Sequence, residues 1–185
     1  HTTFILFTGM SIENGGLGYD AKANGYVFAF VGLVGVLVQG VFMRSKLAQR
    51  LDSRMMMVFG ILVCGLGIGW IPYLSPEPFV IALIPMAMIA LGNGLFQPTQ
   101  NTLLTLEAKS TSLDLGRVMG AQEGYGAMAR IIGPIVAAFV WAETVDRPDK
   151  WDYHTVFRLS FALAVLAIIS QITLRLTHQN KQLRD

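Results

Sequence analysis

The amino-acid sequence predicts an all-α membrane protein built as a bundle of six transmembrane helices. Hydrophobic residues fill 53% of the 185 positions, and charged residues fill only 14%, about half the charge density of an ordinary soluble domain. Apolar runs of helix length recur along the whole chain, and they contain almost no charged residues. Because such a chain cannot cover itself with polar surface, we expect the apolar runs to cross a lipid bilayer.

Five runs reach the roughly 20 mostly apolar residues that are needed to cross about 30 Å of hydrocarbon. They cover residues 25–43, 55–74, 79–98, 118–142 and 156–174. A sixth run, 2–12, is too short to cross at about 1.5 Å per residue, so we expect its beginning to be missing from a longer chain. The connections are short and none is a low-complexity linker, which predicts a single transmembrane domain over residues 1–185.

The basic residues predict which side of the membrane each loop faces. If the spans alternate in direction, nine basic residues fall at one end of the bundle and three at the other. The nine are Arg44, Lys46, Arg50, Arg54, Lys109, Arg117, Arg175, Lys181 and Arg184. The positive-inside rule makes their end cytoplasmic, and seven of the eight Trp and Tyr residues fall at the opposite end. We therefore expect an integral protein of the plasma or inner membrane, with both chain ends cytoplasmic.

Several functional classes are excluded or disfavoured by what the sequence lacks. The net charge of +2 is small and the basic residues form no stripe with interleaved aromatics, so we expect no nucleic-acid partner. The three histidines and single cysteine have no metal-ligand spacing, and enzyme motifs are absent, so we expect neither a cofactor nor an enzyme. The glycines of 65–69 lie within an apolar helix-length run, which favours helix packing over phosphate binding.

Three segments carry a resemblance to a known family. The basic turn KLAQRLDSR, 46–54, resembles the degenerate loop between the eighth and ninth helices of major facilitator transporters, with Asp52 in place of the usual glycine. Glycines at 116, 120, 124 and 126 and the pair Gly133-Pro134 resemble the eleventh helix of exporters in that superfamily. The span with Pro85, Asn93 and Gln97 resembles the tenth helix, so the chain as a whole is similar to the C-terminal six-helix half.

The resemblance implies a twelve-helix fold, alternating access and a substrate site near the midplane between two halves. The partners it implies are the lipid bilayer, a small-molecule substrate, protons as a candidate coupling ion, and the N-terminal six-helix half or a second copy of this chain. It also makes Arg50, Asp52 and Arg54 candidates for a cytoplasmic gate loop. The function expected is therefore secondary active transport of a small organic solute, with a drug or metabolite exporter or antiporter favoured.

Polar side chains within the apolar runs are the candidate substrate pathway. Asn93, Gln97 and Gln100 share one face of a helix, and amides exposed to lipid are costly, so this face should meet protein or water. Two interpretations stay open for it, a wall of the central cavity or hydrogen bonding between helices.

Two ionisable residues, Glu123 and Arg130, lie well inside a span. They share a helix face, but their separation of about 10 Å along the axis predicts that they do not form a direct ion pair. We expect each to have another partner, which for Glu123 would be Arg50, Arg54 or a residue of the missing half. Proton or substrate chemistry is the alternative role for Glu123.

The four-residue spacing of Gly116, Gly120 and Gly124 predicts a surface where another helix backbone can approach closely. This pattern also allows a second function from a different class, a six-helix membrane scaffold or interaction protein that transports nothing. Charged residues in the hydrocarbon favour transport over the scaffold, since a scaffold has no need of them.

Overall fold

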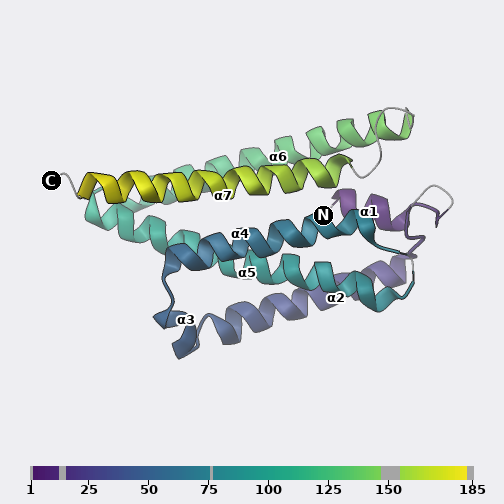
Figure 1. The fold of residues 1–185 in the computed structure, drawn as a ribbon, viewed down its shortest axis with the longest axis horizontal. Helices are drawn as coiled ribbons and strands as arrows, with labels where there is room; N and C mark the ends of the chain where they lie inside the picture. Colours follow the sequence, from purple (N-terminus) through teal and green to yellow (C-terminus); the bar gives the residue numbers. More distant parts are fainter. Residues whose placement is uncertain (1, 13–15, 76, 147–154, 183–185) are drawn as a thin grey trace.

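The chain forms a bundle of long helices that lie side by side (Figure 1). The computed structural model describes residues 2–12, 16–75, 77–146 and 155–182, and every regular element in these ranges is helical. The elements are α1 (Thr2–Gly9), α2 (Ala21–Val36), the π-helical turn η2 (Leu37–Phe42), α3 (Lys46–Arg50), α4 (Ser53–Trp70), the 3₁₀ turn η3 (Ile71–Tyr73), α5 (Phe79–Ser110), α6 (Leu115–Asp146) and α7 (Thr155–Gln182). Five helical segments of the described chain are long and apolar enough to span a membrane, which confirms the predicted all-α, membrane-type fold. The sixth run forms only the eight-residue α1.

Several helices extend beyond the apolar runs that predicted them, most of all α5 and α7. The run that was expected to end at Pro98 continues as α5 to Ser110, and α7 continues past residue 174 to Gln182. The prediction of these ends was wrong because apolar composition reports the thickness of the hydrocarbon, whereas helical hydrogen bonding continues into the polar layer. Pro98 does not end α5 either, since a proline is tolerated inside a membrane helix that neighbouring helices hold in place.

The α4–α5 pair is the centre of the bundle, and glycines bring the two backbones into contact. A Cβ atom on Gly92 of α5 would lie 2.5 Å from the carbonyl oxygen of Gly60 on α4. Nearer the start of α5, a Cβ on Gly67 of α4 would lie 2.8 Å from the carbonyl oxygen of Pro85 on α5. Such close approach provides the van der Waals packing that holds helices together in lipid, where the hydrophobic effect between helices is absent.

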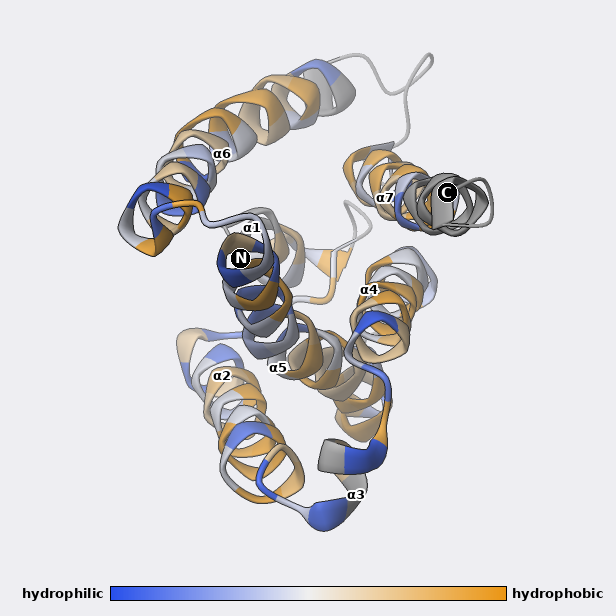
Figure 2. Cartoon of the chain, turned by 90° about the vertical axis from the view of Figure 1, so that its left-hand side faces the viewer, coloured by the Kyte–Doolittle hydropathy of each residue, from blue (hydrophilic) through white to orange (hydrophobic). Residues whose placement is uncertain are grey.

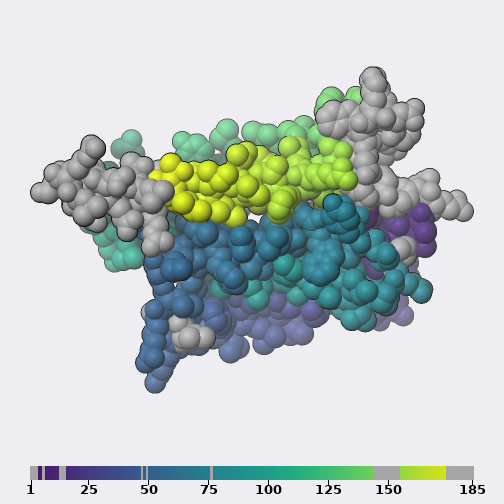
Figure 3. Space-filling view, viewed as in Figure 1, coloured from purple at the N-terminus to yellow at the C-terminus, as the bar shows by residue number. Residues whose placement is uncertain are grey.

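Two further helices pack on this pair, again through glycines. On α4, a Cβ at Gly65 would lie 2.9 Å from the Cβ of Ala164 on α7, and one at Gly69 would lie 3.0 Å from the ring of Phe161. The side chains of α7 accordingly lie directly along α4 in the space-filling view (Figure 3). On the other side of α5, Val38 of η2 packs against Gly94, where a Cβ would lie 2.8 Å from the Val38 Cγ1 atom. The predicted packing role of the glycines in 65–69 is confirmed.

The helix ends that were predicted to share one side of the membrane meet at one end of the bundle. A hydrophobic cluster there joins residues of α1 and the connection after it, the first part of α2, the η3 turn and the residue after it, the start of α5 and the start of α7. Its buried members are Phe4, Phe7, Leu17, Val27, Ile71, Leu74, Ala82, Met86 and Phe157. Tyr19 and Trp141, two of the aromatic residues assigned to this end, pack against the cluster, while Trp151 and Tyr153 lie outside the described residues.

The helix α6 lies apart from this core. Viewed along the bundle, α7 lies beside α4, whereas α6 stands away from the α2–α5–α4 group and contacts α1, α5 and α7 (Figure 2). No residue of α6 in the membrane-length segment Leu115–Glu143 is buried. Its apolar side chains therefore remain available to lipid or to another protein.

The first prediction concerns sidedness. Ser110, at the end of α5, and Ser75, in the connection before α5, are exposed at opposite ends of the bundle. In a Cys64→Ala background, we expect Ser110→Cys to react with a membrane-impermeant thiol reagent only from the cytoplasmic side, and Ser75→Cys only from the other side. Labelling of intact cells and of inside-out vesicles measures this, and equal or reversed accessibility would contradict the predicted orientation.

Candidate functional site

A polar face runs along the half of α5 that is nearer Ser110. Asn93, Gln97 and Asn101 follow one another at four-residue spacing, and all three are exposed. The remaining faces of this part of α5 are occupied, since Gly92 lies against α4 and Gly94 against η2. Gln100, which was predicted on the same face, is half-buried at its edge. The structure thus keeps these amides out of the packed core, and the side of α5 that carries them meets α6 at Asn101.

A side-chain hydrogen bond joins this face to α6. The Gln122 Nε2 amide donates to the Asn101 Oδ1 oxygen at 2.8 Å. The Gln122 Oε1 oxygen is shielded from solvent and has no hydrogen-bond partner within the part of the chain that is described. A buried acceptor without a donor costs free energy. The Gln122 Oε1 oxygen is therefore free to accept a hydrogen bond from a polar group that enters between α5 and α6.

The prediction that Glu123 and Arg130 do not form a direct ion pair is wrong. The Arg130 guanidinium nitrogen Nη2 lies 3.4 Å from the Glu123 carboxylate oxygen Oε2, which forms an ion pair. The side chain of a helical residue leans toward the helix N-terminus, so an arginine seven residues after a glutamate reaches back to it and shortens the axial gap. Gly126 lies between them, and a Cβ there would make an ordinary van der Waals contact with the guanidinium, at 3.8 Å.

This ion pair also replaces the partners that were expected for Glu123. Arg50 and Arg54 belong to the loop and start of α4, and within the described residues the ion partner recorded for Glu123 is Arg130. Both side chains of the pair are open, 72% exposed for Glu123 and 69% for Arg130. An ion pair that lies open on a membrane-length helix needs water or protein around it, because lipid would not solvate either charge.

The candidate gate loop has a local structural role that the sequence did not reveal. Ser45 caps the short α3, accepting a hydrogen bond from the Ala48 amide at 3.2 Å. Asp52 caps α4, accepting from the Arg54 amide at 3.0 Å. An acidic cap at a helix start satisfies free amides and favours the helix dipole, which explains an aspartate at this position. Arg50 and Arg54 are exposed, and their role as a gate stays a prediction.

The glycine stripe of α6 faces open space within this chain. A Cβ on Gly120 or Gly124 would meet no atom within 4 Å. Gly116 instead lies in the first turn of α6, where its amide donates to the Asp114 carboxylate at 2.9 Å. The predicted close helix partner of this stripe is therefore none of the described helices of this chain.

Two members of the polar face, Asn101 and Gln122, were not among the residues predicted from the sequence. Asn101 was detectable, since it continues the spacing of Asn93 and Gln97 by one more turn. Gln122 could not be assigned, because its contact depends on how α6 is placed against α5. Asn93 also accepts a long contact from the Cys64 thiol, 3.9 Å from Sγ to Oδ1, at the boundary between the polar face and α4.

The described chain is all-helical, with five helical segments long and apolar enough to span a membrane, and the polar face of α5 is hydrogen-bonded to α6 at Asn101. Comparisons of the chain with protein-family models, with curated protein sequences and with solved structures found no match. The resemblance to major facilitator transporters accordingly stays a prediction from the residues that carry it.

Proposed function

We propose that this chain belongs to a secondary active transporter that moves a small organic solute by alternating access. The observation that carries the proposal is the row of exposed amides on α5, Asn93, Gln97 and Asn101, which Gln122 of α6 joins through its hydrogen bond to Asn101. Amides on membrane-length helices are costly in lipid and useful in a cavity, where they can donate and accept hydrogen bonds to a polar solute. The unpartnered Gln122 oxygen supports this interpretation, because it offers an acceptor that the chain itself does not satisfy.

The position of α6 supports a moving role for this helix. Small residues and backbone contacts fix α4 against α5 and α7, whereas α6 has no buried residue in its membrane-length segment. Alternating access requires one group of helices to move against another around a fixed site. A helix held through side-chain contacts, such as the Gln122–Asn101 hydrogen bond, can change neighbours at a lower cost than one held through backbone contact.

The transporter requires a second set of helices facing α6 and the polar face. The family resemblance supplies two candidates, an N-terminal six-helix half and a second copy of this chain. The open stripe at Gly120 and Gly124 supports a protein neighbour on that side, because such a stripe permits close helix approach. In this arrangement, α5 would correspond to the tenth helix and α6 to the eleventh helix of a major facilitator transporter.

The open glycine stripe equally favours the rival function, a membrane scaffold that packs against another protein. The two functions differ at the polar face, since a scaffold would pack Gln97 and Asn101 permanently and would have no route for solute. Transport is tested by reconstituting the intact protein in vesicles that contain a pH-sensitive dye and adding small organic solutes one at a time. We expect a solute-dependent proton or solute flux that falls when Asn93 and Gln97 are replaced by leucine. Tight assembly with a partner and no flux for any solute would favour the scaffold.

The second prediction tests the neighbour of the glycine stripe. Replacing Gly124 by leucine should leave the unfolding of the chain by itself nearly unchanged, because a Cβ there meets no atom of the chain within 4 Å. The same change should weaken association with the partner by about 1–3 kcal/mol, the usual cost of overpacking a fitted contact. Crosslinking yield in membranes measures the association, and parent-like crosslinking would show that the stripe faces lipid.

A further inference from the structure

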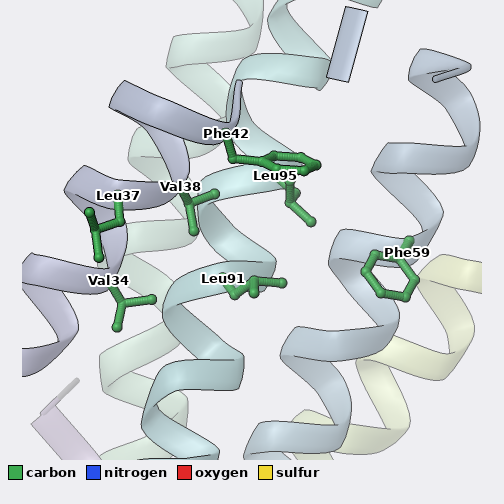
Figure 4. A pocket seen from close by; sticks show the side chains of 7 residues that line it. All are labelled: Val34, Leu37, Val38, Phe42, Phe59, Leu91 and Leu95. Carbon is green, nitrogen blue, oxygen red and sulfur yellow. The ribbon is translucent and has the colours of Figure 1, made fainter. Parts of the chain in front are cut away.

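An apolar groove lies on the side of α5 opposite the polar face. It has a volume of about 350 Å³ and opens between α2 with η2 on one side and α4 on the other (Figure 4). Its lining side chains are Val34, Leu37, Val38, Phe42, Phe59, Leu91 and Leu95. Leu91 and Leu95 form its floor, and Leu95 is two residues away from both Asn93 and Gln97, which places it on the far face of the helix. A groove lined only by hydrocarbon fits an apolar chain and offers nothing to a polar solute.

The π-helical turn η2 shapes the end of the groove that is nearer the basic loop. The Met43 amide donates to the Val38 carbonyl at 2.9 Å, which closes the wider five-residue turn in this part of the helix. Phe42, the last residue of η2, lies over this end, while Phe59 of α4 lies on the opposite wall (Figure 4). Both Leu37 and Phe59 are about half exposed, so the groove is open to the surroundings of the bundle.

Four basic residues lie in the chain segment that follows this end of the groove. The connection through α3 carries Arg44, Lys46, Arg50 and Arg54, all exposed, and α3 joins the ends of α2 and α4 (Figure 2). Within the described residues no ion pair neutralises these four cations. The nearby acid, Asp52, is engaged as the cap of α4. The groove therefore combines an apolar channel with a cluster of unpaired cations at the membrane surface.

We infer that the groove binds an acyl chain of an anionic phospholipid, whose phosphate group rests on the basic connection between Arg44 and Arg54. The match is one of charge and polarity: a hydrocarbon chain lies along Leu37, Phe59 and Leu95, and the anionic head group meets the cations. Basic residues beside a membrane helix attract anionic lipids, which are enriched in the cytoplasmic leaflet where this loop is predicted to lie. A neutral lipid or an apolar helix would fill the groove and leave the four cations unmatched. The inference requires membrane insertion and does not depend on transport.

The test places a fluorescent reporter in the groove and compares two brominated lipids, which quench tryptophan on contact. Phe59→Trp puts the reporter on the groove wall, and Leu66→Trp places a matched reporter on an exposed part of α4 outside it. The intact protein is reconstituted in mixed vesicles with brominated phosphatidylglycerol or brominated phosphatidylcholine, and the quenching of the unsubstituted protein is subtracted. At position 59 we expect brominated phosphatidylglycerol to be bound in preference to brominated phosphatidylcholine by on the order of five-fold or more, as judged from the quenching. At position 66 we expect the two lipids to quench nearly equally.

Two charge variants decide whether the loop is responsible. In the Phe59→Trp protein, the double change Arg44→Gln and Arg50→Gln should bring the lipid preference close to one, and high salt should lower it. Lys109→Gln with Arg117→Gln, two exposed residues of the other basic connection, should leave the preference unchanged. Equal quenching by both lipids in the parent would overturn the inference and make this groove an ordinary lipid contact. Absence of quenching by either lipid would also overturn it, because protein would then cover the groove.

Discussion

Replacing Gly92 by leucine is expected to destabilise the bundle by more than about 3 kcal/mol, the upper end of the usual cost of overpacking. The Cβ atom alone would lie 2.5 Å from the Gly60 carbonyl oxygen, 2.6 Å from the Cys64 Cβ and 2.7 Å from the Cys64 amide nitrogen. Two of these three atoms belong to the backbone of α4, so no rotamer of the new side chain can relieve the contact. The gain in helix propensity, at most about 1 kcal/mol, is too small to compensate.

Thermal unfolding of the intact protein in detergent measures this effect, with Gly32→Leu as the matched control. Gly32 lies in the apolar part of α2, and a Cβ there would meet no atom within 4 Å, so leucine should cost little. Gly92→Ala should already lower the unfolding temperature, because the conflict begins at the Cβ atom. Equal stability of the Gly92→Leu and Gly32→Leu proteins would contradict the packing of α4 against α5 described here.

Replacing Glu123 by glutamine is expected to reduce proton-driven transport by the intact protein to background. Glu123 lies about 12 Å along α6 from Leu115, within the apolar part of the helix. A carboxylate in this position can bind and release a proton during a conformational cycle, as intramembrane acids do in pumps and exchangers. Glutamine keeps the shape and can still accept a hydrogen bond from Arg130, but it cannot carry the proton.

Two measurements on the Glu123→Gln protein separate coupling from folding. Solute exchange without a pH gradient should persist, while uptake driven by a pH gradient should be lost. Glu107→Gln, at an exposed site near the end of α5, serves as the control and should transport like the parent. Full proton-driven uptake by the Glu123→Gln protein would leave Glu123 with a structural role, and loss of folding would make its pair with Arg130 an obligatory structural contact.

The sequence was sufficient to predict what depends on composition along the chain. Apolar length predicted the long helices, and alternating direction predicted that Tyr19 and Trp141 would meet at one end of the bundle, as they do in its hydrophobic cluster. Glycine spacing within an apolar run also predicted that Gly65 and Gly69 pack against another helix, which proved to be α7. These features follow from hydrophobicity and small size, which each residue carries on its own.

Features that depend on helix placement or side-chain direction could not be predicted from the sequence. A membrane helix is apolar on every side, so its pattern does not say which side packs, and the glycines of α6 and of α4 look alike although only those of α4 are covered. The Glu123–Arg130 pair was missed because counting axial rise ignores the backward lean of the arginine side chain. The Asn101–Gln122 hydrogen bond was missed because it joins two helices whose relative position no local pattern records.

The measurement that tests the central claim most directly is the water accessibility of Gln97 in the membrane. Two single-cysteine variants are made in a Cys64→Ala background, Gln97→Cys and, as the control, Leu163→Cys at an exposed apolar position of α7. Each variant is treated in membranes with a hydrophilic thiol reagent. If α5 and α6 border an aqueous solute pathway, the cysteine at 97 reacts and the cysteine at 163 does not, because the reagent does not enter lipid. Failure of both positions to react, with the protein folded, would place Gln97 in a permanently packed interface and contradict the proposed pathway.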